Sequence, residues 1–178
     1  MTEPTTRLPS STLGLVFLLL ASVPADAEQG AARLEAMVGD WHVDYEMAPG
    51  PSGRGGSGEG AMTARRGPAG NSLILDFEST SGPTAGFEIH QVIAWDPDRQ
   101  AYDVVWVDTY NPGVQTAGGR ADGDEIVYSR EAVHGDVRMV TKGVVSAVGT
   151  RSFTITSYLS LDGGPDVKTM TLRYSRRE

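Results

Sequence analysis

Apolar and polar side chains alternate along short runs of this sequence, from Trp41 to its C-terminal end. In the first run, Trp41, Val43 and Tyr45 alternate with His42 and Asp44. A period of two puts every second side chain on one face of a β-strand. Comparable runs lie at 73–77, 87–95, 102–107, 126–128, 137–145, 153–159 and 170–174. The pattern therefore predicts an all-β chain.

Turn-forming residues separate these runs. Glycine, proline, asparagine and aspartate gather at 67–71, 81–83, 96–98, 111–113, 122–124, 134–136 and 162–165. These residue types favour tight turns, because glycine and asparagine tolerate positive φ and proline restricts φ. Strands at intervals of roughly ten residues, with no helix between them, are antiparallel neighbours. We expect about ten strands on this basis.

A sheet of this size has to protect its edge strands, and closure removes them. We therefore predict an antiparallel up-and-down β-barrel of about 8–10 strands, with a two-sheet sandwich as the alternative. A short helix predicted at 31–38 would plug the closed end of the barrel. The glycine-rich segment 49–58 fits either a mobile loop at the mouth or an insertion without function, and we favour the insertion.

The N-terminus has the pattern of a signal peptide. Arg7 precedes an apolar run at 13–23, which is about half the length that a membrane-spanning helix needs. Pro24 ends the run, and Ala25-Asp26-Ala27 fits the small-x-small cleavage rule. We expect residues 1–27 to be a signal peptide rather than an anchor, and residues 28–178 to form a single β-barrel domain. The protein is then periplasmic or secreted.

Charge and cysteine content narrow the class of partner. The signal peptide carries Glu3, Asp26 and Arg7, so its removal changes the net charge from −8 to −7. An acidic body argues against binding to nucleic acid or to an anionic membrane surface, and we expect neither as a partner. The chain has no cysteine, which excludes thiolate catalysis and thiolate metal sites. The oligomeric state stays open.

Gly39-Asp40-Trp41 resembles the Gly-x-Trp signature that opens the first strand of lipocalins and related barrels. In those barrels a basic residue of the last strand packs across the tryptophan, and Arg173 is the candidate here. An indole can cover the floor of a barrel while a guanidinium stacks on its face. The resemblance implies a lipocalin/calycin-like barrel.

Three further motifs, Gly86-Phe87-Glu88, Ala94-Trp95-Asp96 and Trp106-Val107-Asp108-Thr109, resemble the bacterial DUF1579 family of uncharacterised proteins. The resemblance covers roughly residues 34–131, with Trp95 in place of the usual tyrosine and Thr109 in place of the usual serine. It implies a fold rather than an activity. Nitrobindin-like haem barrels look like more distant relatives, but this chain lacks their longer glycine-rich run after the tryptophan, and we expect no cofactor.

The three histidines, His42, His90 and His134, form no metal-binding pair on one strand. The alternation predicts that His42 and His90 point outward, and His134 lies in a predicted turn. The chain also lacks a Gly-x-Ser-x-Gly elbow. We therefore expect neither a metal site nor Ser-His-Asp hydrolysis.

Asp108 lies two residues after Trp106 in the same run, so the alternation gives both side chains the same parity and predicts that Asp108 points into the barrel. A carboxylate there needs a partner or a raised pKa. Arg130, which has the parity of Tyr128, is the candidate partner. The pair either orients the strands or forms a ligand-anchoring or acid–base group at the mouth, and we favour the structural role.

We expect the barrel to bind a small apolar ligand in its interior rather than to catalyse a reaction. The predicted ligand-binding residues combine an aromatic wall with a few polar groups and are Trp41, Tyr45, Phe87, Trp106, Asp108, Tyr128 and Arg130. Two alternatives stay open. One is an enzyme of the cyclase or isomerase type that uses Asp108 as acid or base, and the other is a structural or interaction module with a filled core.

Overall fold

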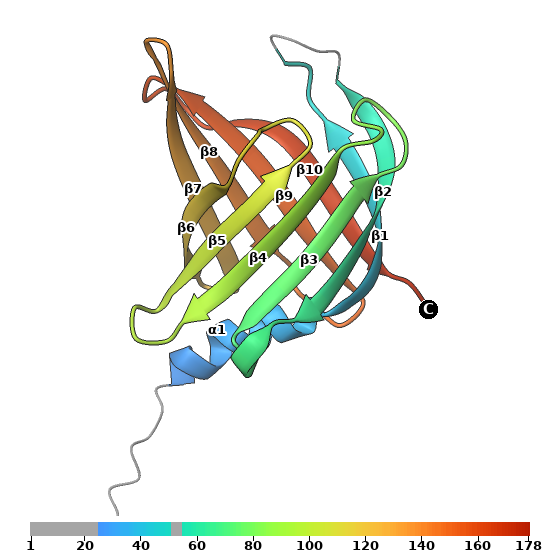
Figure 1. The fold of residues 1–178 in the computed structure, drawn as a ribbon, viewed down its shortest axis with the longest axis vertical. Helices are drawn as coiled ribbons and strands as arrows, with labels where there is room; N and C mark the ends of the chain where they lie inside the picture. The colour runs from blue at the N-terminus through green and yellow to red at the C-terminus, as the bar shows by residue number, and fades with distance from the viewer. Residues whose placement is uncertain (1–24, 51–54) are drawn as a thin grey trace, which may run out of the picture.

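The computed structural model describes residues 25–50 and 55–178 and, within them, forms a closed barrel of ten antiparallel strands (Figure 1). The strands are β1 (Gly39–Met47), β2 (Gly56–Arg66), β3 (Ser72–Ser79), β4 (Glu88–Asp96), β5 (Ala101–Asp108), β6 (Gln115–Asp122), β7 (Glu125–His134), β8 (Val137–Ser146), β9 (Ser152–Leu161) and β10 (Val167–Arg176). Each strand pairs with its neighbours in sequence, and β1 pairs with β10 to close the sheet. The predicted up-and-down barrel is confirmed, and the sandwich alternative is wrong.

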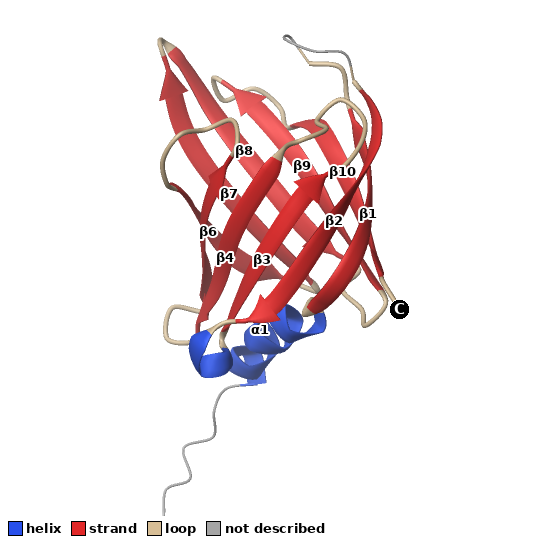
Figure 2. Ribbon diagram, turned by 45° about the vertical axis from the view of Figure 1, so that its right-hand side comes forward, coloured by secondary structure: helices blue, strands red, loops and turns tan. Residues whose placement is uncertain are grey.

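One helix, α1 (Ala25–Ala36), lies across one end of the barrel, which we call the closed end (Figure 2). Gly30 of α1 packs flat on the ring of Trp95, since a Cβ at Gly30 would lie 2.3 Å from that ring. The hydroxyl of Tyr102 donates to the carbonyl of Gly30 at 3.2 Å. The predicted plugging helix is therefore present, although it begins at Ala25 rather than Ala31. A single-turn 3-10 helix, η1 (Pro68–Gly70), joins β2 to β3.

The predicted signal peptide lies mostly in residues 1–24, which are outside the described residues, so export stays a prediction. Among residues 25–50 and 55–178, no helix is long and apolar enough to cross a membrane.

The closed-end half of the barrel is a packed core built around Trp41, which is fully buried. The indole Nε1 of Trp41 donates to the carbonyl of Met37 at 2.9 Å, which ties the end of α1 to the floor. The ring of Phe153 meets Trp41 edge-on at 4.8 Å and stacks on Tyr174 at 4.1 Å. Edge-to-face and stacked rings are the favoured geometries of aromatic pairs. This half of the interior is therefore filled with side chains.

The basic residue over the floor tryptophan is Arg176, and the prediction of Arg173 was wrong. The guanidinium carbon of Arg176 lies 4.5 Å from the centroid of the Trp41 ring. Tyr174 points inward, so Arg173 points outward, where it pairs with Glu46 at 3.4 Å. Arg176 shares the parity of Tyr174 and stands opposite Trp41 in the ladder. The same alternation that placed Trp41 inside excludes Arg173 from the floor.

Arg176→Met should lower the free energy of unfolding by about 1–3 kcal/mol, because it removes a cation–π contact and hydrogen bonds to carbonyls. Those carbonyls belong to Thr150 and Ala36. Arg173→Met, the matched control, should change stability by less than about 0.5 kcal/mol, since it breaks an exposed ion pair. Urea denaturation of the two variants measures the difference. Equal losses would assign no special role to the guanidinium over Trp41.

The glycine-rich segment 49–58 is not wholly an insertion, because β2 begins inside it. Gly56 and Gly58 pair with Met47 and Tyr45 of β1. A Cβ at Gly58 would lie 2.3 Å from the hydroxyl of Tyr45. Glycine is thus required where the large neighbouring side chain crosses the strand. Residues 51–54 of the segment lie outside the described residues.

Candidate functional site

A cavity of about 510 Å³ occupies the other half of the barrel, between the packed floor and the open end. The loops that join β3 to β4 and β5 to β6 lie at this end of the barrel (Figure 1), and Thr84 and Tyr110 of these loops line the cavity. Most of its wall is apolar. Aliphatic side chains from four strands supply the deeper part, and these are Met62, Leu75, Ile155 and Leu172, while Ile89 lies nearer the mouth, opposite Asp108. The interior is therefore filled at one end and open at the other.

The predicted ligand-binding residues divide between these two halves. Six of them line the cavity, and these are Tyr45, Phe87, Trp106, Asp108, Tyr128 and Arg130. Trp41 does not, because it lies in the packed floor beneath. Contact of these seven residues with a ligand stays a prediction. Gln91, Thr141 and Ser157 also line the cavity and were not predicted as site residues. Their inward parity in β4, β8 and β9 was the available signal.

Tyr45 fastens the loop between β3 and β4 to the barrel wall. Its hydroxyl donates to the carbonyl of Ser81 at 2.6 Å and accepts from the hydroxyls of Ser79 at 3.1 Å and Thr84 at 2.8 Å. Burial alone raises the pKa of Tyr45, but the hydrogen bonds from Ser79 and Thr84 outweigh burial and lower it. Because the hydroxyl forms hydrogen bonds with the β3–β4 loop, the part of Tyr45 that remains available to a ligand is its ring.

Asp108 caps the turn that follows β5. One carboxylate oxygen accepts from the backbone N–H of Tyr110 at 2.8 Å and of Asn111 at 2.7 Å. The other accepts from Nε1 of Trp106 at 3.1 Å. Within the described residues no ion pair joins Asp108 to Arg130, so the predicted pair is wrong. Backbone donors of the turn, which parity does not reveal, satisfy the carboxylate instead.

Arg130 projects from β7 into the cavity without a carboxylate partner. Among the described residues, no carboxylate oxygen lies within 4.0 Å of its nitrogens. Its guanidinium carbon lies 6.0 Å from the centroid of the Trp106 ring, at the outer limit of a cation–π contact. Lys142, the other cation at this cavity, pairs with Asp166 and lies 4.9 Å from the ring of Tyr158. Among residues 25–50 and 55–178, the cavity thus contains one positive charge without a carboxylate partner.

Tyr128 lies one inward position below Arg130 on β7, and its ring extends over β8. A Cβ at Gly143 would lie 2.2 Å from Cζ of Tyr128, so the ring occupies the space of a missing side chain. Burial raises the pKa of Tyr128 to about 12. Burial also raises the pKa of Tyr174, and the charge of an ionised Tyr128 raises it further. Both hydroxyls are therefore neutral at ordinary pH.

Alkaline pH should destabilise the barrel through Tyr128. The pKa of an unfolded tyrosine is about 10, so the unfolded state loses this proton first as the pH rises. The contribution is complete below about pH 10 and is lost as the pH approaches the folded value of about 12. In this pH range, the free energy of unfolding measured in urea should fall less steeply with pH for Tyr128→Phe than for the wild type. Tyr110→Phe, at an exposed tyrosine, is the control, and equal slopes in all three proteins would contradict the assignment.

The histidines lie outside the cavity, as predicted from the alternation. His90 bonds to Asp76 at 2.6 Å on the outer wall, and His134 is exposed at the end of β7. His42 lies on the outer face of β1. The residues that line the cavity therefore offer no imidazole to a haem iron, and they do not fit the haem of the nitrobindin-like barrels.

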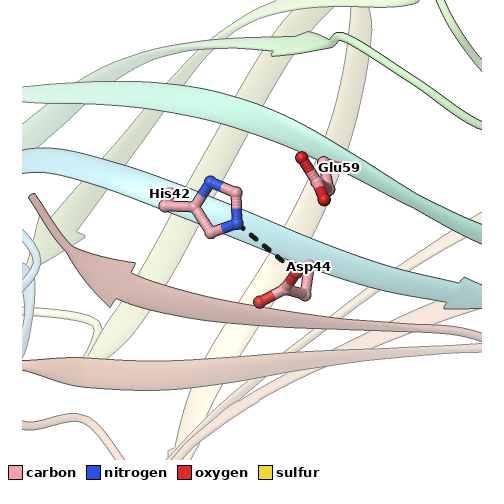
Figure 3. A group of neighbouring side chains, drawn as sticks. All are labelled: His42, Asp44 and Glu59. Atoms are coloured by element: carbon pink, nitrogen blue, oxygen red, sulfur yellow. Dashed lines mark hydrogen bonds and ion pairs between the residues drawn. The ribbon is translucent and has the colours of Figure 1, made fainter.

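Figure 3 shows His42, Asp44 and Glu59 together on the outer face of β1 and β2, with ligand atoms within 4.8 Å of one another. The His42 Nε2 lies 3.4 Å from Asp44 Oδ1, and Asp44 faces Glu59 across the ladder. The group is largely exposed to solvent, and nothing else in the described part of the chain points to a ligand there. We assign no metal site to it.

Comparisons with known proteins bear on the fold. A model of the family described as "Protein of unknown function (DUF1579)" matches residues 27–176. The crystal structure of Rv2717c from M. tuberculosis superposes with a TM-score of 0.55, at 10% identity, over 84% of this chain and 98% of that chain. A redesigned β-barrel gives a TM-score of 0.42, at 15% identity, over 84% and 96% of the two chains. No curated protein matches the chain.

Proposed function

Because the chain belongs to the DUF1579 family, as its motifs predicted, and that family has no known function, we propose a function from the cavity itself. The protein binds a small, mostly apolar molecule in the open half of its barrel. We further propose that it does so in the periplasm or outside the cell, after removal of residues 1–27. The observation that carries the binding proposal is the cavity of about 510 Å³ above a packed floor.

The size and composition of the cavity support binding. Its volume lies within the range of about 300–1,000 Å³ that is usual for pockets of small molecules. Its wall is mainly apolar, with a few convergent polar groups, which is the usual composition of such pockets. Transfer of an apolar molecule from water to this wall is favourable by roughly 25 cal/mol per Å² of apolar surface that it buries.

The two alternatives have less support. An acid or base at Asp108 needs a free carboxylate, whereas turn N–H groups and Trp106 occupy its oxygens. A module with a filled core fits the closed-end half of the barrel and not the open half. We therefore propose binding without catalysis.

A neutral fluorescent probe, N-phenyl-1-naphthylamine, tests the binding proposal. Ala117 lines the cavity, and Thr116, its neighbour on β6, is exposed on the outer face. Ala117→Trp should fill part of the cavity and lower the affinity for the probe by about tenfold or more. Thr116→Trp should keep an affinity within about twofold of the wild-type value. Circular dichroism checks that both variants fold. A wild-type protein that does not bind the probe, or two variants that lose it equally, would overturn the proposal.

The export proposal has its own test. When the full chain is expressed in a Gram-negative host, the protein recovered from the periplasm should have the intact mass of a chain that begins at Glu28. A protein that stays in the cytoplasm with residues 1–27 attached would contradict the proposal.

A further inference from the structure

The wall of the cavity contains a cation, Arg130, that has no counter-ion among the described residues, and this indicates the chemical class of the ligand. We propose that the ligand is a singly charged amphiphile, whose carboxylate binds Arg130 and whose apolar tail lies against the aliphatic wall nearer the floor. This inference rests on the proposed function, because it needs the cavity to be a binding site. It adds the chemical class and the orientation of the ligand.

The charge balance around Arg130 supports an anionic ligand. Several other cations of the described barrel have carboxylate partners, for example Arg138 with Glu131 at 2.6 Å and Arg99 with Asp103 at 2.8 Å, and unpaired ones such as Lys168 are exposed. Arg130 has none among the described residues, although it is half-buried. The nearest candidate by parity, Asp108, already accepts from backbone and side-chain N–H groups. A charge in an apolar wall is costly unless it is paired, and a ligand carboxylate supplies the missing partner.

The geometry also gives the orientation. In the ladder, Arg130 stands opposite Thr141, and Tyr128 stands opposite Gly143 one inward step nearer the closed end. The side chains of Ile155 and Leu172 pair one step nearer the floor still. On this part of the wall, Arg130 and Thr141 therefore lie towards the mouth, and Ile155 and Leu172 lie nearer the floor. An amphiphile fits with its head at Arg130 and its tail pointing to the closed end.

A carboxylate suits this site better than a phosphate monoester. The guanidinium of arginine presents a planar fork of N–H donors that a carboxylate can bridge with two hydrogen bonds. In the part of the chain that the structure describes, the site offers one cation without a counter-ion, and this cation balances one negative charge. A doubly charged phosphate would leave a second charge unpaired in an apolar cavity.

This inference can be tested by competition of dodecanoate and of 1-dodecanol against N-phenyl-1-naphthylamine at about pH 8. The two compounds have alkyl chains of the same length and differ in the head group alone. The wild type should prefer the carboxylate by about tenfold or more, as expected for a charge-assisted hydrogen bond. Arg130→Gln should remove the preference, and Arg130→Lys should retain part of it. Arg120→Gln changes the net charge equally at an exposed arginine of the outer wall and should keep the wild-type ratio.

The outcomes separate the two proposals. Equal affinity of acid and alcohol for the wild type, or an unchanged preference in Arg130→Gln, would overturn this inference while probe binding still supports the cavity. Failure of the wild type to bind the neutral probe would overturn the proposed function itself. Far-UV circular dichroism and urea denaturation of Arg130→Gln check that the variant folds as the wild type does, independently of any ligand.

Discussion

Trp41→Ala should lower the free energy of unfolding by about 3–5 kcal/mol, which is the usual cost of removing a large aromatic side chain from a packed core. Trp41 is fully buried, and its removal abolishes three contacts at once. These are the hydrogen bond to Met37, the edge contact with Phe153 and the cover by Arg176. Because Met37 follows α1, we also expect the helix to detach from the closed end. A loss of this size is a large fraction of the stability of a typical domain.

Trp106→Ala is the matched control for this prediction. Trp106 is half-buried and faces the cavity, so its removal enlarges an existing space rather than creating a new one. We expect a loss of about 1–2 kcal/mol, mainly from its hydrogen bond to Asp108 and its partial burial. Urea denaturation monitored by far-UV circular dichroism measures both variants. Equal losses would mean that the floor is no more tightly packed than the cavity wall.

The sequence predicted most of the barrel because alternation reports directly which side chains share a face. Eight strands contain a run of large apolar residues and could be recognised. β2 and β6 could not, because glycine and alanine occupy most of their inward positions, with Met62 and Gln115 as the exceptions. The reason is packing: Gly58 makes room for Tyr45, and Gly119 lies between Tyr102 and Tyr128. A strand whose small side chains accommodate the large side chains of neighbouring strands shows no alternation of large apolar and polar residues.

The candidate site was predictable in position but not in pairing. Parity placed Asp108 and Arg130 inside the barrel, and both line the cavity. Parity does not tell which donors reach a side chain, and the turn after β5 supplied backbone N–H groups that satisfied Asp108. The division of the interior into a filled and an open half was equally hidden. It depends on how far each side chain extends, for instance Tyr128 over Gly143, and not on its position in the alternation.

The choice of Arg173 over Arg176 has a different origin. Arg173 was selected from a resemblance to other barrels, whereas the alternation in β10 already assigned it to the outer face. Where a motif and the local period disagree, the period has the stronger physical basis, because it follows from the geometry of the strand.

Gly143→Ala should cost about 1–3 kcal/mol, the usual penalty of overpacking, and should weaken ligand binding as well. The new Cβ would lie 2.2 Å from Cζ of Tyr128, so the ring has to move. The ring can move into the cavity, where it occupies space that a ligand needs. We therefore expect the affinity for N-phenyl-1-naphthylamine to fall by about tenfold.

Two further variants make the Gly143 prediction specific to this contact. Gly118→Ala, on the open face of β6 where an added Cβ meets no atom within 4 Å, should change stability by less than about 0.5 kcal/mol. Tyr128→Leu in the Gly143→Ala background should recover the stability and the probe affinity, because the shorter side chain no longer reaches β8. A double-mutant cycle therefore gives a coupling of about 1 kcal/mol or more between the two positions. Additive effects would mean that Gly143 acts through the backbone of β8 and not through its contact with the ring of Tyr128.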